Sequence, residues 1–482
     1  MNLSTTIKSI QDIMRKDVGV DGDAQRISQL VWMIFLKIFD DREQELELIE
    51  DDYKGPLPES WRWRNWAADP EGMTGEELLG FIDNGLFPGL KELSVSDESD
   101  KRALLLREIF KGAYNYMKSG TLIRQVINKL NEIDFNSSED RHLFGDIYEQ
   151  ILKGLQSAGN AGEYYTPRAV TQFMVDRVDP KLKESFMDPA CGTGGFITSA
   201  IEHIRNRYVK SVKDEARLQD SVFGVEKKPL PHLLCTTNML LHGIDVPLQI
   251  RHDNTLARPL RSYSKTDRVD VVVTNPPFGG MEEDGIETNF PKKYQTRETA
   301  DLFLVLIMHI LKPKGRAGIV LPDGTLFGEG VKTRIKERLL TECNLHTIVR
   351  LPNGVFSPYT GIKTNLLFFQ KGKPTKDVWY YEHPYPAGYK SYSKTKPLRI
   401  EEFEPEKKWW KKRKENEFAW KVSAKEIEAA NYNLDIKNPH VEEEENGDPA
   451  EMLTEYRELL ADVSQIRDRL KHELMQALEG KK

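Results

Sequence analysis

The sequence predicts an α/β protein built on a doubly wound, seven-stranded, Rossmann-like sheet, with an N-terminal helical domain and a long C-terminal helix. From about residue 141 onward, short apolar runs typical of buried parallel strands alternate with helical segments. The expected strands are residues 186–188, 222–226, a segment ending at Asp253, 269–274, 317–322, 347–351 and 366–369. Because only a short loop with Pro352, Gly354 and Gly361 separates the last two strands, we expect them to form an antiparallel hairpin.

The first part of the chain, residues 1–140, is expected to form the helical domain. Ile7, Ile10 and Met14 fall on one face of a helix, and a second, more apolar helix continues through Trp32. At 482 residues the chain is long enough for more than one domain. The sheet is therefore assigned to a second domain, residues 141–437.

The C-terminal part is expected to be a linker and a helix. Residues 438–448 include consecutive glutamates and an Asn-Gly-Asp turn sequence, so they predict an acidic linker. In residues 449–482, apolar side chains recur at three- and four-residue steps, as in a coiled coil: Tyr456, Leu459, Val463, Ile466, Leu470 and Leu474. A helix of this length needs a partner for that stripe. It either folds back on its own subunit or docks against helices of another chain.

Composition narrows the class of protein. With 39% hydrophobic and 30% charged residues, the chain is globular. Cys191, Cys235 and Cys343 lie far apart without metal-ligand spacing, so we expect neither disulfides nor a metal site, in keeping with the reducing cytoplasm. Neither a signal-peptide core nor a run of 18 apolar residues is present in the sequence, which predicts no membrane span.

A glycine-rich string, Asp188-Pro-Ala-Cys-Gly-Thr-Gly-Gly-Phe196, follows the first expected strand and precedes a helix. Glycines at such a turn let the backbone approach a nucleotide-like cofactor, and Glu226 at the end of the next strand is placed to hold ribose hydroxyls. The string lacks Gly-Lys-Ser/Thr, which disfavours nucleotide hydrolysis. The alternative is that these glycines only allow close packing of helix on strand.

A second string, Asn275-Pro276-Pro277-Phe278, follows the expected strand 269–274. The Asn275 side-chain oxygen and the Pro276 carbonyl could hold both hydrogens of an exocyclic amine, and Phe278 could stack on a planar base. Ligands of open α/β sheets bind at such strand ends. The two strings together favour methyl transfer to an amino group, whereas a plain turn is the alternative for the second.

These motifs resemble those of amino-methyltransferases that use S-adenosylmethionine, and specifically the modification subunits of type I restriction–modification systems. The resemblance extends to both ends of the chain and rests on residues 163–168, 188–196, Glu226, 253–256, 275–278 and 356–359. It implies transfer of a methyl group from S-adenosyl-L-methionine to adenine N6 in DNA.

The resemblance also implies roles for individual residues. The string before the glycine turn would pack over the methionine end of the cofactor: Glu163, Tyr164, Tyr165, Thr166, Pro167 and Arg168. The cofactor would be lined by Asp188, Gly192, Thr193, Gly194 and Gly195. Glu226 would take the ribose hydroxyls and Asp253 the adenine amino group. The catalytic loop would be Asn275, Pro276, Pro277 and Phe278.

Partners are implied in the same way. After Phe369 the sequence shows no target-recognition domain of the kind that single-chain adenine methyltransferases carry. We therefore expect double-stranded DNA as substrate, a separate specificity subunit that chooses the sequence, a restriction subunit, and two modification subunits per complex. The net charge of −7 fits a chain that supplies only part of the DNA contact.

Other interpretations stay open. An amino-methyltransferase acting on RNA or protein would use a similar Asn-Pro-Pro loop, and an assembly subunit could retain the fold without catalysis. The basic segment 407–414, with Trp409 and Trp410, either contacts phosphates or forms an amphipathic helix with buried tryptophans and a solvated basic face.

Overall fold

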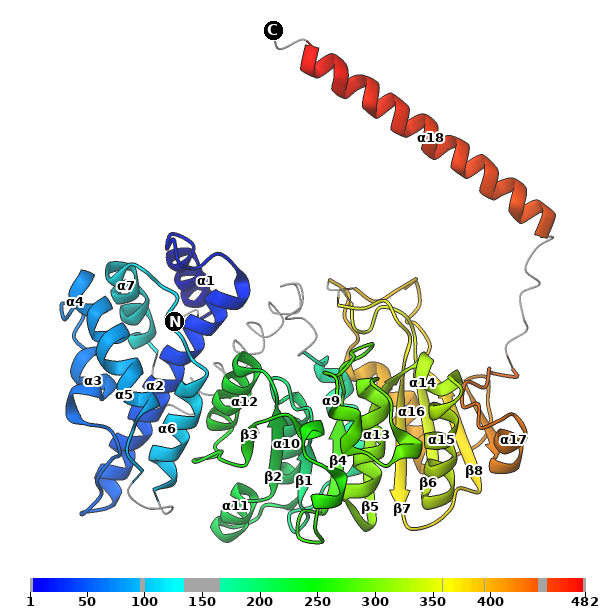
Figure 1. Ribbon diagram of the computed structural model, residues 1–482, viewed down its shortest axis with the longest axis horizontal. Helices are drawn as coiled ribbons and strands as arrows, with labels where there is room; N and C mark the ends of the chain where they lie inside the picture. Colours follow the sequence, from blue (N-terminus) through cyan, green and yellow to red (C-terminus); the bar gives the residue numbers. More distant parts are fainter. Residues whose placement is uncertain are drawn as a thin grey trace. The chain divides into compact units, whose positions relative to one another are not determined.

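The computed structural model describes residues 3–95, 100–133, 165–357, 359–393, 395–440 and 449–479. The chain divides into two units, Met1–Ile436 and Lys437–Lys482 (Figure 1). Glu163, Tyr164 and most of the expected acidic linker lie outside the described residues.

The N-terminal region is helical. Its elements are α1 (Leu3–Met14), α2 (Asp23–Ile49), η1 (Glu59–Trp61), α3 (Trp63–Trp66), α4 (Gly75–Gly80), η2 (Phe81–Leu86), α5 (Phe87–Lys91), α6 (Lys101–Lys111) and α7 (Gly120–Asn131). As the spacing predicts, Ile7, Ile10 and Met14 are buried on one face of α1. Their core extends into Leu233 and Leu234 of the helix α12 (Pro229–Leu241), so these helices pack beside the edge of the sheet that strand β3 (Ile250–His252) forms (Figure 1).

The sheet has nine strands in the order β3-β2-β1-β4-β5-β7-β6-β8-β9. The strands are β1 (Phe186–Asp188), β2 (Val222–Glu226), β3 (Ile250–His252), β4 (Val269–Thr274), β5 (Leu311–Pro322), β6 (Cys343–Leu351), β7 (Thr364–Lys371), β8 (Asp377–Glu382) and β9 (Ala419–Ser423). All seven expected strands are present. The antiparallel pairing expected for the last two of them, β6 and β7, is confirmed.

The expected number of strands was wrong, because β8 and β9 extend the sheet beyond β6. Strand β8 pairs parallel to β6, and β9 pairs antiparallel to β8. The run Val378–Tyr381 is β-prone, but lysines flank it closely on the N-terminal side. Its place in the sheet depends on pairing with residues about 30 positions earlier, which local periodicity does not reveal.

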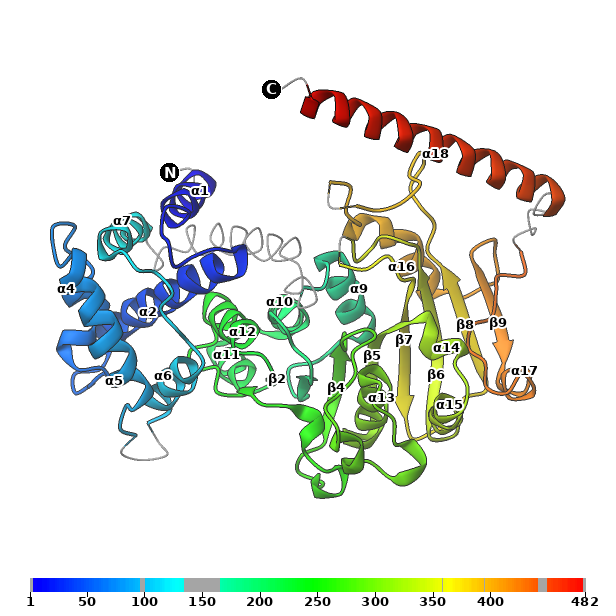
Figure 2. The same cartoon turned by 45° about the horizontal axis from the view of Figure 1, so that its top comes forward.

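Helices cover both faces of this sheet (Figure 2). The larger helices are α9 (Arg168–Val178), α10 (Gly195–Tyr208), α11 (Val212–Gln219), α12 (Pro229–Leu241), α13 (Thr299–Ile310), α14 (Asp323–Phe327), α15 (Val331–Glu342), α16 (Glu404–Lys411) and α17 (Ala424–Ala429). Short 3₁₀ turns are η4 (Thr255–Ala257), η5 (Leu260–Ser262), η6 (Ile286–Asn289), η7 (Lys292–Tyr294) and η8 (Ile400–Phe403). Successive residues of β4 face opposite cores: Val271 and Val273 pack with α9 and α10, whereas Val272 packs with α13.

The basic tryptophan segment is part of this packing. Trp409 is buried and Trp410 partly buried, with ring centroids 5.1 Å and 5.0 Å from Tyr381 and Phe368, respectively. The Arg413 guanidinium lies over both indoles. The amphipathic-helix interpretation of residues 407–414 is therefore the one that the structure supports.

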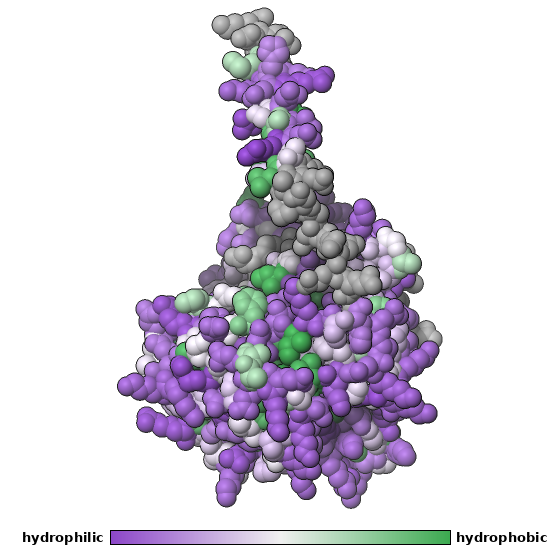
Figure 3. Space-filling view, turned by 90° about the vertical axis from the view of Figure 1, so that its right-hand side faces the viewer, coloured by the Kyte–Doolittle hydropathy of each residue, from purple (hydrophilic) through white to green (hydrophobic). Residues whose placement is uncertain are grey.

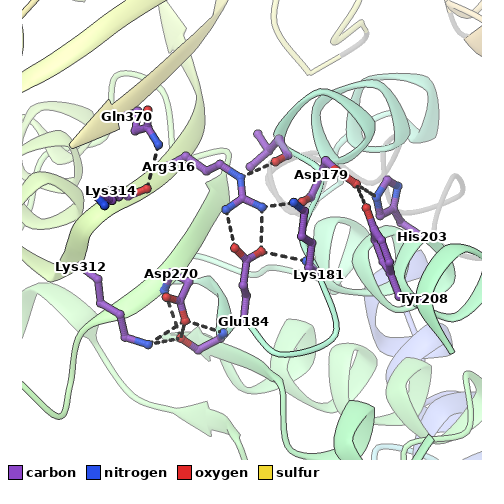
Figure 4. A network of polar contacts seen from close by, with 12 residues as sticks. Asp179, Lys181, Glu184, His203, Tyr208, Asp270, Lys312, Lys314, Arg316 and Gln370 are labelled. Carbon is purple, nitrogen blue, oxygen red and sulfur yellow. Dashed lines mark hydrogen bonds and ion pairs between the residues drawn. The ribbon is translucent and has the colours of Figure 1, made fainter. Parts of the chain in front are cut away.

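A polar network ties the amino-terminal edge of the sheet to α9 (Figure 4). Arg316 of β5 donates hydrogen bonds to both carboxylate oxygens of Glu184, at 2.8 and 2.7 Å, and to the Val178 carbonyl at 2.6 Å. Asp270 of β4 accepts from the backbone and hydroxyl of Ser185 and from Lys312. The network holds the loop between α9 and β1, and thereby the start of the strand that leads into the glycine turn.

The second unit contains α18 (Pro449–Glu479), a helix of 31 residues. Its apolar side chains are exposed among charged ones, and Figure 3 shows green residues scattered between purple ones along this helix. Tyr456, Leu459, Val463, Ile466 and Leu470 are each more than half exposed. Within the described residues, every helix is too short or too polar to cross a bilayer.

The Arg316 network generates a stability prediction. Arg316→Ala should lower the free energy of unfolding by about 2 kcal/mol, because Glu184 and the backbone carbonyls of Val178 and Asp179 lose their donor. Arg217→Ala is the control, since its pair with Asp214 lies on the surface and its removal should change stability by less than about 0.5 kcal/mol. Urea denaturation followed by tryptophan fluorescence measures both. Equal effects of the two substitutions would contradict the role of the network.

Candidate active site

A cavity of about 270 Å³ opens at the carboxyl edge of the sheet. Because β1 has β2 on one side and β4 on the other, the chain crosses over in opposite directions at this point, which leaves a crevice there. The ends of β1, β2, β3 and β4 all contribute to the walls of the cavity. Among the residues that line it are Thr166, Asp188, Gly192, Gly195, Glu226, Asp253, Asn275 and Pro277.

The glycine turn between β1 and α10 forms the floor of this cavity. Gly192 and Gly194 have φ of +54° and +85°, a backbone conformation that favours glycine. A Cβ on Gly194 would lie 2.8 Å from the Cys235 sulfur atom, so the turn also packs too tightly for a larger residue. Cys191 is a buried residue of this turn and lines the cavity.

Glu226 is bound to the glycine turn rather than projecting freely. Its carboxylate accepts hydrogen bonds from the backbone N–H groups of Gly192, at 2.9 Å, and Lys228, at 2.7 Å. The side chain is buried and still lines the cavity. Each carboxylate oxygen offers more than one acceptor direction, so the two backbone bonds orient Glu226 while leaving it able to bind hydroxyl groups.

Asp188 ends β1 beside Glu226. It is 1% exposed, and its carboxylate accepts a hydrogen bond of 3.1 Å from the Ala190 N–H. Burial raises the pKa of Asp188 to about 7, and the nearby charge of Glu226 acts in the same direction. The carboxyl groups of Asp188 and Glu226 thus lie side by side, both buried, at the bottom of the cavity.

Asp253 lies at the rim of the same cavity. Its side chain is 55% exposed, and one carboxylate oxygen accepts a hydrogen bond of 2.8 Å from the neighbouring Asn254 N–H. The side chain of Asn254 in turn accepts from the Leu256 N–H at the start of η4. The carboxylate of Asp253 therefore keeps acceptor capacity toward the cavity.

The Asn-Pro-Pro-Phe loop forms the opposite wall. The Asn275 side-chain nitrogen donates to the Thr166 hydroxyl at 3.0 Å, which turns the amide toward the segment before the glycine turn. Within the described residues, the Asn275 Oδ1 atom is shielded from solvent and accepts no hydrogen bond. Phe278 is half-buried, and its ring meets Phe356 edge to face at 5.6 Å. A buried acceptor without a donor is costly, so this amide is a candidate ligand contact.

Not every residue expected at the site reaches the cavity. Pro276, Tyr165 and Pro167 are buried and Phe278 half-buried next to the lining residues. Thr193 and Gly194, within the glycine turn, contact α12 instead: Asn238 donates to the Thr193 carbonyl at 3.2 Å. Arg168 donates to the Gly195 carbonyl at 2.9 Å and so fixes the start of α10. The structure thus brings most of the predicted residues together, with some in supporting positions.

The sequence motifs missed one wall of the cavity. Lys227, Met281, Glu282 and Thr299 also line it. Glu282 is 9% exposed and accepts hydrogen bonds from Lys227 at 3.3 Å and Thr299 at 3.4 Å. These residues carry no motif. Lys227 directly follows Glu226, and Met281 and Glu282 come shortly after the Asn-Pro-Pro-Phe loop, which is the only signal in the sequence that could have indicated them.

The raised pKa of Asp188 predicts a pH dependence of stability. An unfolded aspartate has a pKa of about 3.9, so ionisation of Asp188 at higher pH destabilises the folded state. As the pH rises from about 4 to about 7, the free energy of unfolding of the ligand-free protein should fall by an amount on the order of 3 kcal/mol, relative to that of the Asp188→Asn variant. Denaturation midpoints at pH 5 and pH 8 measure this difference. Asp253→Asn, at the exposed rim, is the control, and an equal pH dependence in both variants would refute the assignment.

Comparisons with known proteins agree with this geometry. The chain is 63% identical over 489 residues to the type I restriction enzyme EcoEI methylase subunit of Escherichia coli, covering 100% of this chain and 99% of that protein. A modification subunit of a putative type I restriction enzyme from Vibrio vulnificus YJ016 is 47% identical, with a TM-score of 0.82, and the match covers 91% of this chain and 97% of that one. A chain from a type I restriction–modification system, solved in a study of complex assembly and conformational transition, is 37% identical with a TM-score of 0.83, covering 100% and 99% of the two chains.

Two family models match the sequence. The HsdM N-terminal domain covers residues 3–130, and the N-6 DNA Methylase model covers residues 139–448. The matched family and the named relatives support adenine N6 in DNA rather than an RNA or protein acceptor. The chain belongs to the N-6 DNA methylase family, as an adenine-specific DNA methyltransferase of the type I restriction–modification modification subunits.

Proposed function

We propose that the cavity at the carboxyl edge binds S-adenosylmethionine and that the Asn275–Phe278 loop presents the adenine amino group to it. The observation that carries this assignment is the unsatisfied Asn275 Oδ1 atom, which lies in the wall of a cavity whose floor is the glycine turn. A methyl acceptor held at that wall would lie across the cavity from the acidic residues of β1 and β2.

The residues present fit such a cofactor. Glu226 is oriented by two backbone N–H groups and would accept hydrogen bonds from the ribose hydroxyls. Asp253 at the rim would accept from the cofactor's adenine amino group. Thr166, Asp188, Gly192 and Gly195 would line the rest of the molecule, with Arg168 holding the turn in place. When bound, S-adenosylmethionine supplies an electrophilic methyl group.

The chain's contribution to methyl transfer is mainly positioning. The Asn275 Oδ1 atom and the Pro276 carbonyl would accept the two amino hydrogens of an extruded adenine, which directs the nitrogen lone pair toward the cavity. Phe278, braced by Phe356, would stack on the base. A general base is not required, because the proton leaves a nitrogen that methylation has made cationic.

Assembly is the second part of the proposal. We infer that α18 docks against helices of a separate specificity subunit, which chooses the DNA sequence, and that two copies of this chain join one such subunit together with a restriction subunit. Support comes from the exposed apolar side chains of α18 and from the type I systems to which the relatives belong. The acidic net charge fits a chain that supplies only part of the DNA surface.

Replacement of Asn275 tests the catalytic assignment. In the complex with its specificity subunit, Asn275→Ala should lower adenine methylation by at least about 100-fold, because the amino group loses a fixed acceptor. Binding of the cofactor, measured by calorimetry, should change less than about threefold, since Asn275 is assigned to the base. The readout of activity is label transferred from S-adenosylmethionine to adenine N6 of duplex DNA. Undiminished label, or label on cytosine, would contradict the assignment.

Charged substitutions on α18 test the assembly assignment. Leu459→Lys together with Ile466→Lys should abolish co-purification with the specificity subunit, because a docked apolar stripe cannot accommodate unpaired charges. Arg457→Glu on the same helix is the control for a change of charge alone. Cofactor binding by the isolated chain should be unchanged in each variant. Retention of the complex by the double variant would mean that α18 is not the docking element.

A further inference from the structure

A second cavity, of about 340 Å³, lies beside the active site. It is formed by loops that follow β4 and β5 and precede β7, and its lining includes Gly279, Gly280, Thr299, Asp323, Phe327 and Ile362. Gly280 and Thr299 also line the first cavity, and the Thr299 hydroxyl donates to the Gly280 carbonyl at 2.9 Å. We call this second cavity the outer pocket. Gly280 and Thr299, which line both cavities, lie between it and the catalytic site.

Large apolar side chains are exposed at the outer pocket. Phe327 and Ile362, which line the outer pocket, are 54% and 52% exposed, and Met281, which lines the first cavity next to Gly280, is 62% exposed. A phenylalanine ring that stays half exposed forgoes part of the free energy that its burial would supply. Apolar side chains that gather at the rim of a polar cleft commonly mark a binding surface.

The exposed ring of Phe327 is held in place by a buried lysine. The Lys336 ammonium donates to the carbonyls of Leu326, at 2.6 Å, and Gly328, at 2.8 Å, so it grips the residues on both sides of Phe327. Lys336 is only 1% exposed, and burial lowers its pKa to about 8. Leu326 is fully buried, and its carbonyl also accepts from the Leu434 N–H at 3.0 Å. The buried Lys336 ammonium thus fixes the backbone on both sides of Phe327, whose ring is exposed.

The polar groups around the outer pocket are acceptors rather than cations. Its lining contains Asp323 and Glu298 but no lysine or arginine among the described residues. Asp323 accepts from Asn365 at 2.6 Å, and Glu298 is paired with Lys332. Gly279 and Gly324 have open space where a Cβ would project, so bare backbone faces outward there. Acceptors and an aromatic face suit the amino edge and the plane of a nucleobase, and they disfavour a phosphate.

We propose that the outer pocket receives a second nucleobase of the DNA site, one adjoining the target adenine, and that Phe327 stacks on it. The inference rests on the proposed function of the neighbouring loop. Extruding an adenine from a duplex removes a stacking partner from the flanking bases, and a rigid aromatic side chain at that place restores one. Phe327 is then a DNA-binding residue that favours the extruded state.

The test uses the complex of the full chain with its specificity subunit and a cognate duplex carrying 2-aminopurine beside the target. Phe327→Ala should raise the Kd for cognate DNA and the KM for DNA by about tenfold and abolish the quenching of 2-aminopurine at the flanking position. Phe327→Trp should restore both. Val212→Ala, which removes an 89% exposed side chain from α11, is the matched control.

A second variant separates stacking from folding. Lys336→Met removes the hydrogen bonds to the Leu326 and Gly328 carbonyls but keeps the Phe327 ring. It should therefore weaken DNA binding, as Phe327→Ala does, while cofactor binding is unchanged. The proposal is overturned if Phe327→Ala leaves DNA affinity and flanking fluorescence unchanged, or if it weakens assembly with the specificity subunit instead. Failure of the proposed function would give a different result, because Asn275→Ala would then leave adenine methylation undiminished while Phe327→Ala still weakened DNA binding.

Discussion

The site depends on one topological constraint, the position of β1 between β2 and β4. Since parallel strands end at the same edge, Asp188, Glu226 and Asn275 arrive within one crevice although 87 positions separate the first from the last in the sequence. The crossover helices leave on opposite faces at that point, so the crevice stays open. The positions of the glycine turn, the Glu226 carboxylate and the Asn275 amide all follow from this arrangement.

The bottom of the crevice contains buried carboxyl groups, and their burial lowers the stability of the fold. Asp188 and Glu226 are both buried, and three backbone N–H groups compensate them: those of Ala190, Gly192 and Lys228. The Ala190 and Gly192 donors lie in the turn after β1, where Gly192 and Gly194 adopt positive φ values that favour glycine, and the Lys228 donor follows β2. The restricted backbone of the turn and the burial of two carboxylates both lower the stability of the fold, and both fix the acidic groups in place, as expected for a preorganised binding site.

The segment between β4 and α13 contributes to both cavities. Asn275 and Pro277 near its start and Met281 and Glu282 further along line the first cavity, and Thr299, at the start of α13, lines both cavities. A base held at one wall would therefore affect both neighbouring sites. Sequence choice, in contrast, is assigned to another chain, which suits an acidic subunit whose exposed apolar helix lies in a separate unit.

Local sequence determined the strands, the glycine turn and the Asn-Pro-Pro-Phe loop, because short-range steric preferences and apolar periodicity specify them. It also determined which residue types could bind a cofactor and a base. Only the tertiary structure decided that β8 and β9 join the sheet, that Thr193 contacts α12, and that Glu282 and Phe327 reach the two cavities. Those placements arise from pairing and packing between distant segments, whose free energy no local pattern encodes.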